Sequence, residues 1–296
     1  MNLYIYLLKL NAMKIKKLIL FFSCISSFSV LNAQGFYIGA GGGYGLGAAK
    51  ESGQDSKSTT AGGITNSTQT SNPFSYGQGV NFGLNVGYML KKNFGFELGV
   101  SYLMGSVYTS TYESINSDFS FSIKDETTSK GSMIRLVPAV KVVLGEKKLS
   151  LYSKAGIILG VGSKMVRENN YSYTFIGFGT STYSRSEYSG GISFGVHGAL
   201  GLNYMLSKKI GLALELNGNY QDWAMKKREL TDYTSNGTNM LSSYTVSELE
   251  TIYVNHYTDD GVSGYTNEPS KQTKEYLPFS SIGLNLGIHI SLGKSE

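Results

Sequence analysis

The chain has 296 residues, of which only 16% are charged, and its formal net charge is +5. Four of its 26 basic residues and none of its acidic residues lie within residues 1–33, which leaves 22 basic against 21 acidic residues beyond them. This balance argues against a nucleic-acid-binding protein, which needs clustered positive surface. The single cysteine, Cys24, also lies in this segment, so the remaining chain has no disulfide, Cys-ligated zinc or Cys nucleophile.

The first predicted element is a signal peptide over residues 1–33. A basic stretch that begins at Met13 precedes an apolar run, residues 18–31, which is shorter than the ~20 residues of a membrane-spanning helix. The pattern predicts cleavage before Gln34 and favours Met13 as the true start. A lipoprotein anchored through Cys24 is the alternative, and its motif is a poor match.

Beyond the leader, apolar residues alternate with small or polar residues in eight segments, which is the pattern of strands with two different faces. One face is rich in Leu, Ile, Val, Phe and Tyr, as a lipid-facing surface requires. The other face is mostly Gly, Ala, Ser and Asn, which suits a narrow closed lumen. The predicted strands cover residues 36–46, 79–88, 94–102, 134–142, 149–160, 192–204, 210–217 and 282–292.

The connections between these strands alternate in length. Turns of three or four residues, such as 90–93 and 207–209, alternate with segments of roughly 25 to 55 residues that are rich in Ser, Thr, Asn and Tyr. We therefore predict an all-β fold: an eight-stranded antiparallel up-and-down transmembrane β-barrel over residues 34–296, with long extracellular loops. Residues 171–184 and 242–254 alternate enough to form hairpins above the membrane, and the sequence leaves open whether they add strands.

Aromatic residues near the strand ends are typical of the two girdles that barrels place at the membrane–water interfaces. Some of them flank the short turns, and others stand on the loop side. The predicted girdle residues are Tyr44, Tyr88, Phe94, Tyr102, Tyr204, Tyr220 and Trp223.

Charged residues on the inward faces predict an ionic network in the lumen. Glu97, Lys141, Lys154 and Glu215 each lie a few residues above a short turn, so they share one level of the barrel. Because an unpaired buried charge is costly, we expect these four to pair. Arg135, which lies higher toward the loops, completes the predicted network. The network can fill the lumen or act as a gate for small ions, and filling is favoured because gating needs a second stable arrangement.

The three histidines, His197, His256 and His289, are the catalytic candidates of the sequence. A lipid hydrolase needs Ser, His and a carboxylate together at the lipid surface, whereas His197 and His289 fall on inward faces. His256 lies beside Asp259 and Asp260, which is either a loose cation site or a solvated loop. We therefore predict no enzyme, no cofactor and no metal site.

The leader, the eight strands, the lysine-rich turns and the long outer loops together resemble the small outer-membrane β-barrel family, which includes OmpA-type transmembrane domains and opacity-like surface barrels. The start of the mature chain and the loop style are similar to Bacteroidetes examples. The resemblance implies the outer membrane of a Gram-negative cell. The chain departs from the family pattern at its end, because residues 293–296 follow Leu292 where an aromatic residue is usual.

The predicted function is that of an integral outer-membrane protein with a side-chain-filled lumen and a role in adhesion or envelope integrity. Its expected partners are outer-membrane lipid and, through the loops, an extracellular protein or glycan, and the barrel is expected to be a monomer. A narrow porin-like channel is the alternative, and a lipid-modifying enzyme is a third reading. A soluble lipocalin-like barrel is disfavoured, because its apolar faces would point inward.

Overall fold

The computed structural model describes residues 35–49, 51–145, 148–258 and 267–292. The predicted signal peptide, the chain end after Leu292, and Asp259 and Asp260 beside His256 lie outside the described residues. Among the residues described, no helix is both long and apolar enough to cross a membrane.

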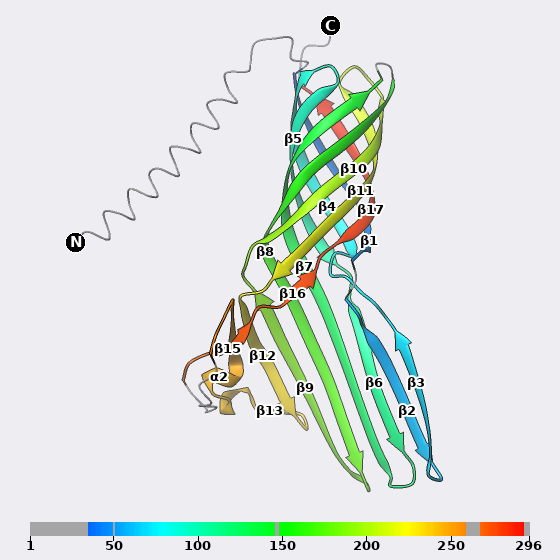
Figure 1. Ribbon diagram of the computed structural model, residues 1–296, viewed down its shortest axis with the longest axis vertical. Helices are drawn as coiled ribbons and strands as arrows, with labels where there is room; N and C mark the ends of the chain where they lie inside the picture. The colour runs from blue at the N-terminus through cyan, green and yellow to red at the C-terminus, as the bar shows by residue number, and fades with distance from the viewer. Residues whose placement is uncertain (1–34, 50, 146–147, 259–266, 293–296) are drawn as a thin grey trace, which may run out of the picture.

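Eight strands form a closed antiparallel ring, seen at the upper end of Figure 1. Each strand pairs with both of its neighbours, and the last strand pairs with the first, so the ring has no free edge. This confirms the predicted eight-stranded barrel. In ring order the strands are β1 (Gly35–Gly47), β4 (Gly79–Lys91), β5 (Phe94–Gly105), β7 (Phe121–Leu144), β8 (Leu149–Phe175), β10 (Ser193–Met205), β11 (Ile210–Ala224) and β17 (Ser281–Ser291).

The barrel wall keeps the period of two that the sequence shows. On β5, Phe96, Leu98 and Val100 are exposed on the outside, whereas Glu97 is buried inside. Apolar side chains point outward in the same way around the ring and form the band that the hydrocarbon of a bilayer covers.

Two strands of the ring are much longer than the barrel requires. β7 has 24 residues and β8 has 27, whereas a tilted membrane-spanning strand needs about 9–11. They leave the barrel still paired with each other, and the pairing continues as far as Phe121 and Phe175 at their distal ends. Figure 1 shows this extension below the barrel as the centre of a second sheet.

This second, extracellular sheet is open and includes strands from all the long loops. Its order is β3–β2–β6–β7–β8–β9–β12–β14–β15, and only the β2–β6 and β14–β15 pairs are parallel. The added strands of this order are β2 (Gln54–Ala61), β3 (Ile64–Ser71), β6 (Tyr108–Asn116), β9 (Phe178–Ser189), β12 (Lys227–Ser235), β14 (Glu250–Val254) and β15 (Ser270–Thr273). The short strand β13 (Thr238–Asn239) pairs with the end of β12, and β16 (Tyr276–Pro278) pairs with the end of the barrel strand β11.

Of the two predicted loop hairpins, one forms and the other does not. Residues 171–184 do form a hairpin, since the end of β8 turns into β9. The prediction for residues 242–254 is wrong, because that segment holds the short helices η1 (Leu241–Ser243) and α2 (Val246–Leu249) before β14. A capping box between Thr245 and Glu248 begins α2 and explains the helical turn.

An apolar cluster fills the place where the barrel meets the extracellular sheet. We call it the junction cluster. Its largest fully buried members are Trp223 and Phe279, whose rings pack edge to face with centroids 5.7 Å apart. The other buried members are Tyr76, Leu103, Met133, Met165, Tyr188, Met225, Tyr253 and Leu277. The cluster closes the loop-side mouth of the barrel with apolar side chains.

Candidate functional site: the barrel lumen and its closures

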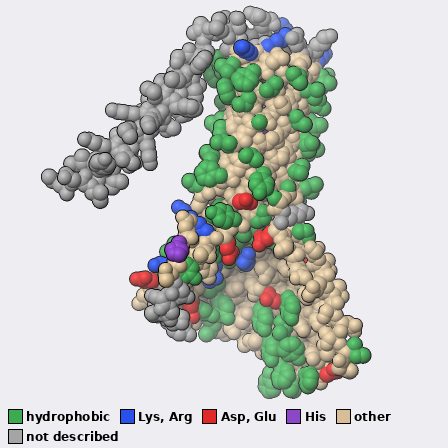
Figure 2. All heavy atoms as spheres, viewed as in Figure 1, with side chains coloured by type: hydrophobic (Ala, Val, Ile, Leu, Met, Phe, Trp, Pro, Cys, Tyr) green, Lys and Arg blue, Asp and Glu red, His purple; other side chains and the backbone are tan. Residues whose placement is uncertain are grey.

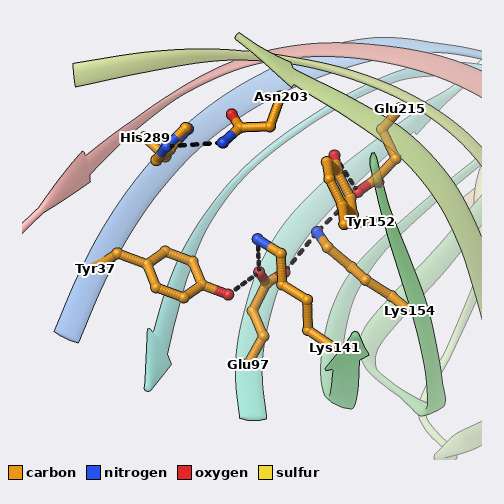
Figure 3. Close-up of polar contacts among 8 residues, drawn as sticks. All are labelled: Tyr37, Glu97, Lys141, Tyr152, Lys154, Asn203, Glu215 and His289. Atoms are coloured by element: carbon orange, nitrogen blue, oxygen red, sulfur yellow. Dashed lines mark hydrogen bonds and ion pairs between the residues drawn. The ribbon is translucent and has the colours of Figure 1, made fainter. Parts of the chain in front are cut away.

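Four charged side chains from four strands meet near the short-turn end of the lumen (Figure 3). The Lys154 ammonium lies 2.7 Å from a carboxylate oxygen of Glu97 and 2.7 Å from one of Glu215. Lys141 lies farther from Glu97, at 3.6 Å. All four side chains are largely buried, and their two positive and two negative charges balance, as burial of a charge requires. Lys154 is therefore the centre of the network, since it alone bridges both carboxylates.

Two tyrosines complete this layer, and sequence reasoning missed both. Tyr37 donates a 2.7 Å hydrogen bond to Glu97, and Tyr152 donates a 3.1 Å bond to Glu215. The Lys141 ammonium also lies 4.4 Å from the Tyr37 ring centroid and 4.6 Å from that of Tyr152, within cation–π range. Strand parity already puts both residues on the inward face, and that signal could have identified them.

Glycines on neighbouring strands make room for these tyrosine rings. A methyl group on Gly87 would overlap the Tyr37 ring, and one on Gly201 would overlap the Tyr152 ring. Small residues at these inward positions therefore leave the space that the two large rings occupy. Together the rings and the ionic network close the lumen near the short turns.

Arg135 does not join the network, and its predicted place there is wrong. It is buried higher in the lumen, where its Nε donates to Gln221 (3.0 Å) and a terminal nitrogen donates to the Phe279 carbonyl oxygen (2.7 Å). Six residues along β7 separate it from Lys141, about 20 Å at the usual strand rise. Arg135 instead forms a second closing layer, on the lumen side of the junction cluster.

A cavity of about 160 Å³ lies in the lumen with the two closing layers among its walls. Its lining includes polar side chains from several strands, among them Asn81, Asn85, His197, Asn217, Asn219 and Asn285. A polar cavity of this size can hold water.

Six of the seven predicted girdle residues point away from the lumen. Tyr44, Phe94, Tyr102, Tyr204 and Tyr220 are exposed, and Tyr88 is half-buried against the ring of Phe36 at a centroid distance of 4.6 Å. Their role in a girdle stays a prediction. The prediction for Trp223 is wrong, because it is fully buried in the junction cluster and donates its ring N–H to the Gly190 carbonyl oxygen. On β11 the even-numbered residues face outward, so position 223 faces inward.

The histidines on the strands contact amides rather than catalytic partners. His197 hydrogen-bonds to Asn219 at 2.8 Å, and His289 lies 3.3 Å from the Asn203 amide nitrogen. His256 is exposed at the end of the described part of its loop. Among the residues that the structure describes, the contacts of His197 and His289 do not bring a serine and a carboxylate together.

A comparison with protein families agrees with this architecture. Residues 18–245 match the family model described as outer membrane protein beta-barrel domain. Among solved structures, Neisserial surface protein A aligns over 88% of this chain and 100% of its own, with 11% identity and a TM-score of 0.32. OprG from Pseudomonas aeruginosa aligns over 89% of this chain and 98% of its own, with 10% identity and a TM-score of 0.42. No curated protein matches the chain.

A closed ring of eight strands with an apolar outer band, and a family model that spans most of the chain, lead to one conclusion. The chain belongs to the outer membrane protein beta-barrel domain family and is an integral β-barrel protein of the Gram-negative outer membrane.

Proposed function

We propose that this protein anchors a rigid extracellular sheet in the outer membrane and presents it to other surfaces, as an adhesion or envelope-integrity protein. One observation carries the proposal: β7 and β8 pass from the barrel into the extracellular sheet still paired with each other, with one register shift between Ser132 and Ile134. A flexible loop would move independently of its anchor, whereas a continuous hydrogen-bonded sheet holds a surface at a set distance from the membrane.

The filled lumen supports this assignment over transport. The ionic layer around Lys154 blocks the barrel at one end, and Arg135 with the junction cluster blocks it at the other. An ion would have to separate buried charge pairs to pass. We infer that the barrel serves as an anchor and shows little steady conductance.

The remaining features of the proposal follow from the sequence. Residues 1–33 are a signal peptide that is removed, residues 34–296 are the barrel domain, and the protein is a monomer without enzymatic activity. Its outer band contacts membrane lipid, and its extracellular sheet contacts a protein or glycan. Ser, Thr, Asn and Tyr, which fill the sheet strands, supply adaptable hydrogen bonds and rigid contact area.

Surface labelling tests the display of the sheet. A short epitope inserted between Gly62 and Gly63, in the β2–β3 turn, should bind antibody on intact cells. The same epitope at Lys208, in a short turn at the opposite end of the barrel, should be labelled only after the outer membrane is opened. Equal labelling of both tags on intact cells would overturn the orientation and the proposal with it.

A narrow channel is the second candidate, because the polar cavity occupies the middle of the lumen. Planar-bilayer recording separates the two functions. The anchor proposal expects near-silence from the wild type and also from Lys154→Ala, because Arg135 and the junction cluster still close the other end of the lumen. Large steady currents from the wild type would favour the channel.

A further inference from the structure

The end of the extracellular sheet farthest from the barrel carries exposed apolar side chains on three neighbouring turns. Figure 2 shows hydrophobic side chains gathered there. The exposed fractions are 67% for Ile64, 67% for Phe119, 62% for Ile176 and 82% for Phe178. Phe178 is the most exposed of the large hydrophobic residues described. We call these four side chains the distal tip.

Hydrogen bonds fix the three turns to one another. The Asp118 carboxylate, in the β6–β7 turn, accepts from the backbone N–H groups of Gly62 and Gly63 at 2.7 and 2.8 Å. The Ile176 N–H, in the β8–β9 turn, donates to the Ser120 carbonyl oxygen at 3.1 Å. The turns therefore form one connected edge, and their apolar side chains are presented together.

The β8–β9 turn keeps an apolar residue where the backbone disfavours it. Ile176 has a φ of +48° and Gly177 a φ of +82°. A β-branched residue such as Ile rarely adopts a positive φ, whereas glycine does so readily. The β12–β13 turn has nearly the same geometry, with φ of +49° and +77°, and is built from Asn236 and Gly237, the usual residues for it. The chain thus uses Asn in one such turn and a strained, exposed Ile in the other. Strain of this kind is typical of functional positions.

The shape and charge of the distal tip indicate what it contacts. Its side chains project from the ends of turns, so they suit a soft surface that they can enter rather than a rigid pocket. The charges behind it are paired, since Lys57 lies 3.0 Å from Glu113 and Lys124 lies 3.3 Å from Glu126. A tip without excess positive charge gains nothing from an anionic surface. Exposed apolar groups that lack a protein cover mark an interaction site.

We propose that the distal tip inserts into a second lipid surface that presents zwitterionic phospholipid, opposite the membrane that holds the barrel. The proposal rests on the proposed display function and names the partner of the displayed sheet. β8 continues about a dozen residues past the barrel, which places the two lipid surfaces about 40 Å apart or more at the usual strand rise. Ile64, Phe119, Ile176 and Phe178 are the inserting residues.

Co-flotation of the full protein, held in lipid nanodiscs, with phosphatidylcholine vesicles tests the proposal. We expect the wild type to float with the vesicles. The variant Phe119→Ser/Ile176→Asn/Phe178→Ser should stay in the bottom fraction of the gradient, unbound. Each lost apolar side chain should reduce binding by about tenfold. Tyr112→Ser, an exposed position partway along β6, is the matched control and should float like the wild type. The heat-modified gel mobility of each variant shows that its barrel is intact.

Two further measurements keep the outcome decisive. Ile176→Asn alone copies the chain's other turn and should fold at least as well as the wild type, yet bind vesicles more weakly. Phe178→Trp adds a tryptophan to a chain whose only other one is fully buried, and vesicles of brominated phosphatidylcholine should quench it. Lipid insertion would be overturned if the wild type does not float with the vesicles, or if the triple variant floats as well as the wild type. Intact surface labelling and silence in bilayers would still support the display function in that case.

Discussion

The barrel and the extracellular sheet share two strands, β7 and β8, yet the side chains of the barrel face lipid and those of the sheet face water. In the barrel, outward residues are Leu, Ile, Val and Phe, and the charges are buried in the lumen. In the sheet, the same strands carry Ser, Thr and charged residues, and their ion pairs are exposed. The backbone pairing is the same in both regions, so the side chains alone adapt one continuous hairpin to lipid and then to water.

The largest expected difference between the regions lies in their ion pairs. Glu97→Ala leaves Lys154 and Lys141 short of a buried partner and should cost about 3–5 kcal/mol of unfolding free energy. Glu113→Ala removes the partner of Lys57 in the sheet and should cost about 1 kcal/mol or less, because that pair is solvated. Urea unfolding in vesicles, followed by gel mobility, measures both. Similar losses would mean that the lumen network is as wet as the sheet surface.

A double-mutant cycle sharpens this point. Glu97→Ala with Lys154→Ala should cost less than the sum of the two single changes, because the pair lies in contact at 2.7 Å. Additive effects would show that the two side chains do not meet.

The next largest difference concerns lysine on the outer face. Leu98, 51% exposed on the barrel, and Tyr112, 47% exposed on the sheet, have similar exposed fractions but face different media. Leu98→Lys should impair folding into bilayers by about 2–4 kcal/mol, whereas Tyr112→Lys should change it by less than about 0.5 kcal/mol. Gly99→Ser, an inward position with space for a side chain, should also be tolerated. The folding yield in vesicles over a urea series checks all three, and equal tolerance of both lysines would place the membrane elsewhere.

A smaller effect compares two turns within the sheet. Ile176→Asn relieves a backbone conformation that costs a β-branched residue about 1 kcal/mol and should stabilise the β8–β9 hairpin by that amount. Asn236→Ile should destabilise the β12–β13 turn by more, because it also removes a 2.8 Å hydrogen bond from the Ser181 N–H. Amide exchange of the flanking strands measures the two changes. A loss of protection in Ile176→Asn would contradict the strain.

The smallest expected effect is a pH dependence at the distal end. Hydrogen bonds from the N–H groups of Gly63 and Gly62 lower the pKa of Asp118 below its usual 3.8. Because folding lowers this pKa, the contact between the turns is fully present above pH 3.8 and weakens as the pH falls through the folded value. The NMR shifts of both glycine amides should titrate with a midpoint below 3.8. A midpoint at or above 3.8 would show that the contact is absent.

The barrel was predictable because lipid imposes a clean alternation. Every strand in the ring has one apolar face, and the period of two identified all eight strands as well as the inward position of Glu97, Lys141, Lys154 and Glu215. The same parity argument, applied strictly, would have placed Trp223 inside and added Tyr37 to the network. In both cases the position along the strand, and not the residue type, decides which side of the wall the side chain takes.

The strands of the extracellular sheet could mostly not be predicted from hydrophobic periodicity. Strands such as β3 and β9 have polar residues on both faces, so their sequence lacks an apolar period. Their pairing is set by β7 and β8, which continue past the membrane, and that continuation has no local signature. Arg135 was misplaced because its partners, Gln221 and the Phe279 carbonyl, lie in segments whose path depends on the junction cluster.

The long hairpin of β7 and β8 also has a mechanical consequence. A pull on the turn beyond Phe175 acts along two antiparallel strands whose hydrogen bonds lie across the direction of load. Those bonds carry the force in parallel, in shear, over the paired stretch from Phe121 to Ser132. Tension at the outer end is therefore delivered to the closed barrel, which yields only as a unit, and the protein behaves as a tether rather than a spring.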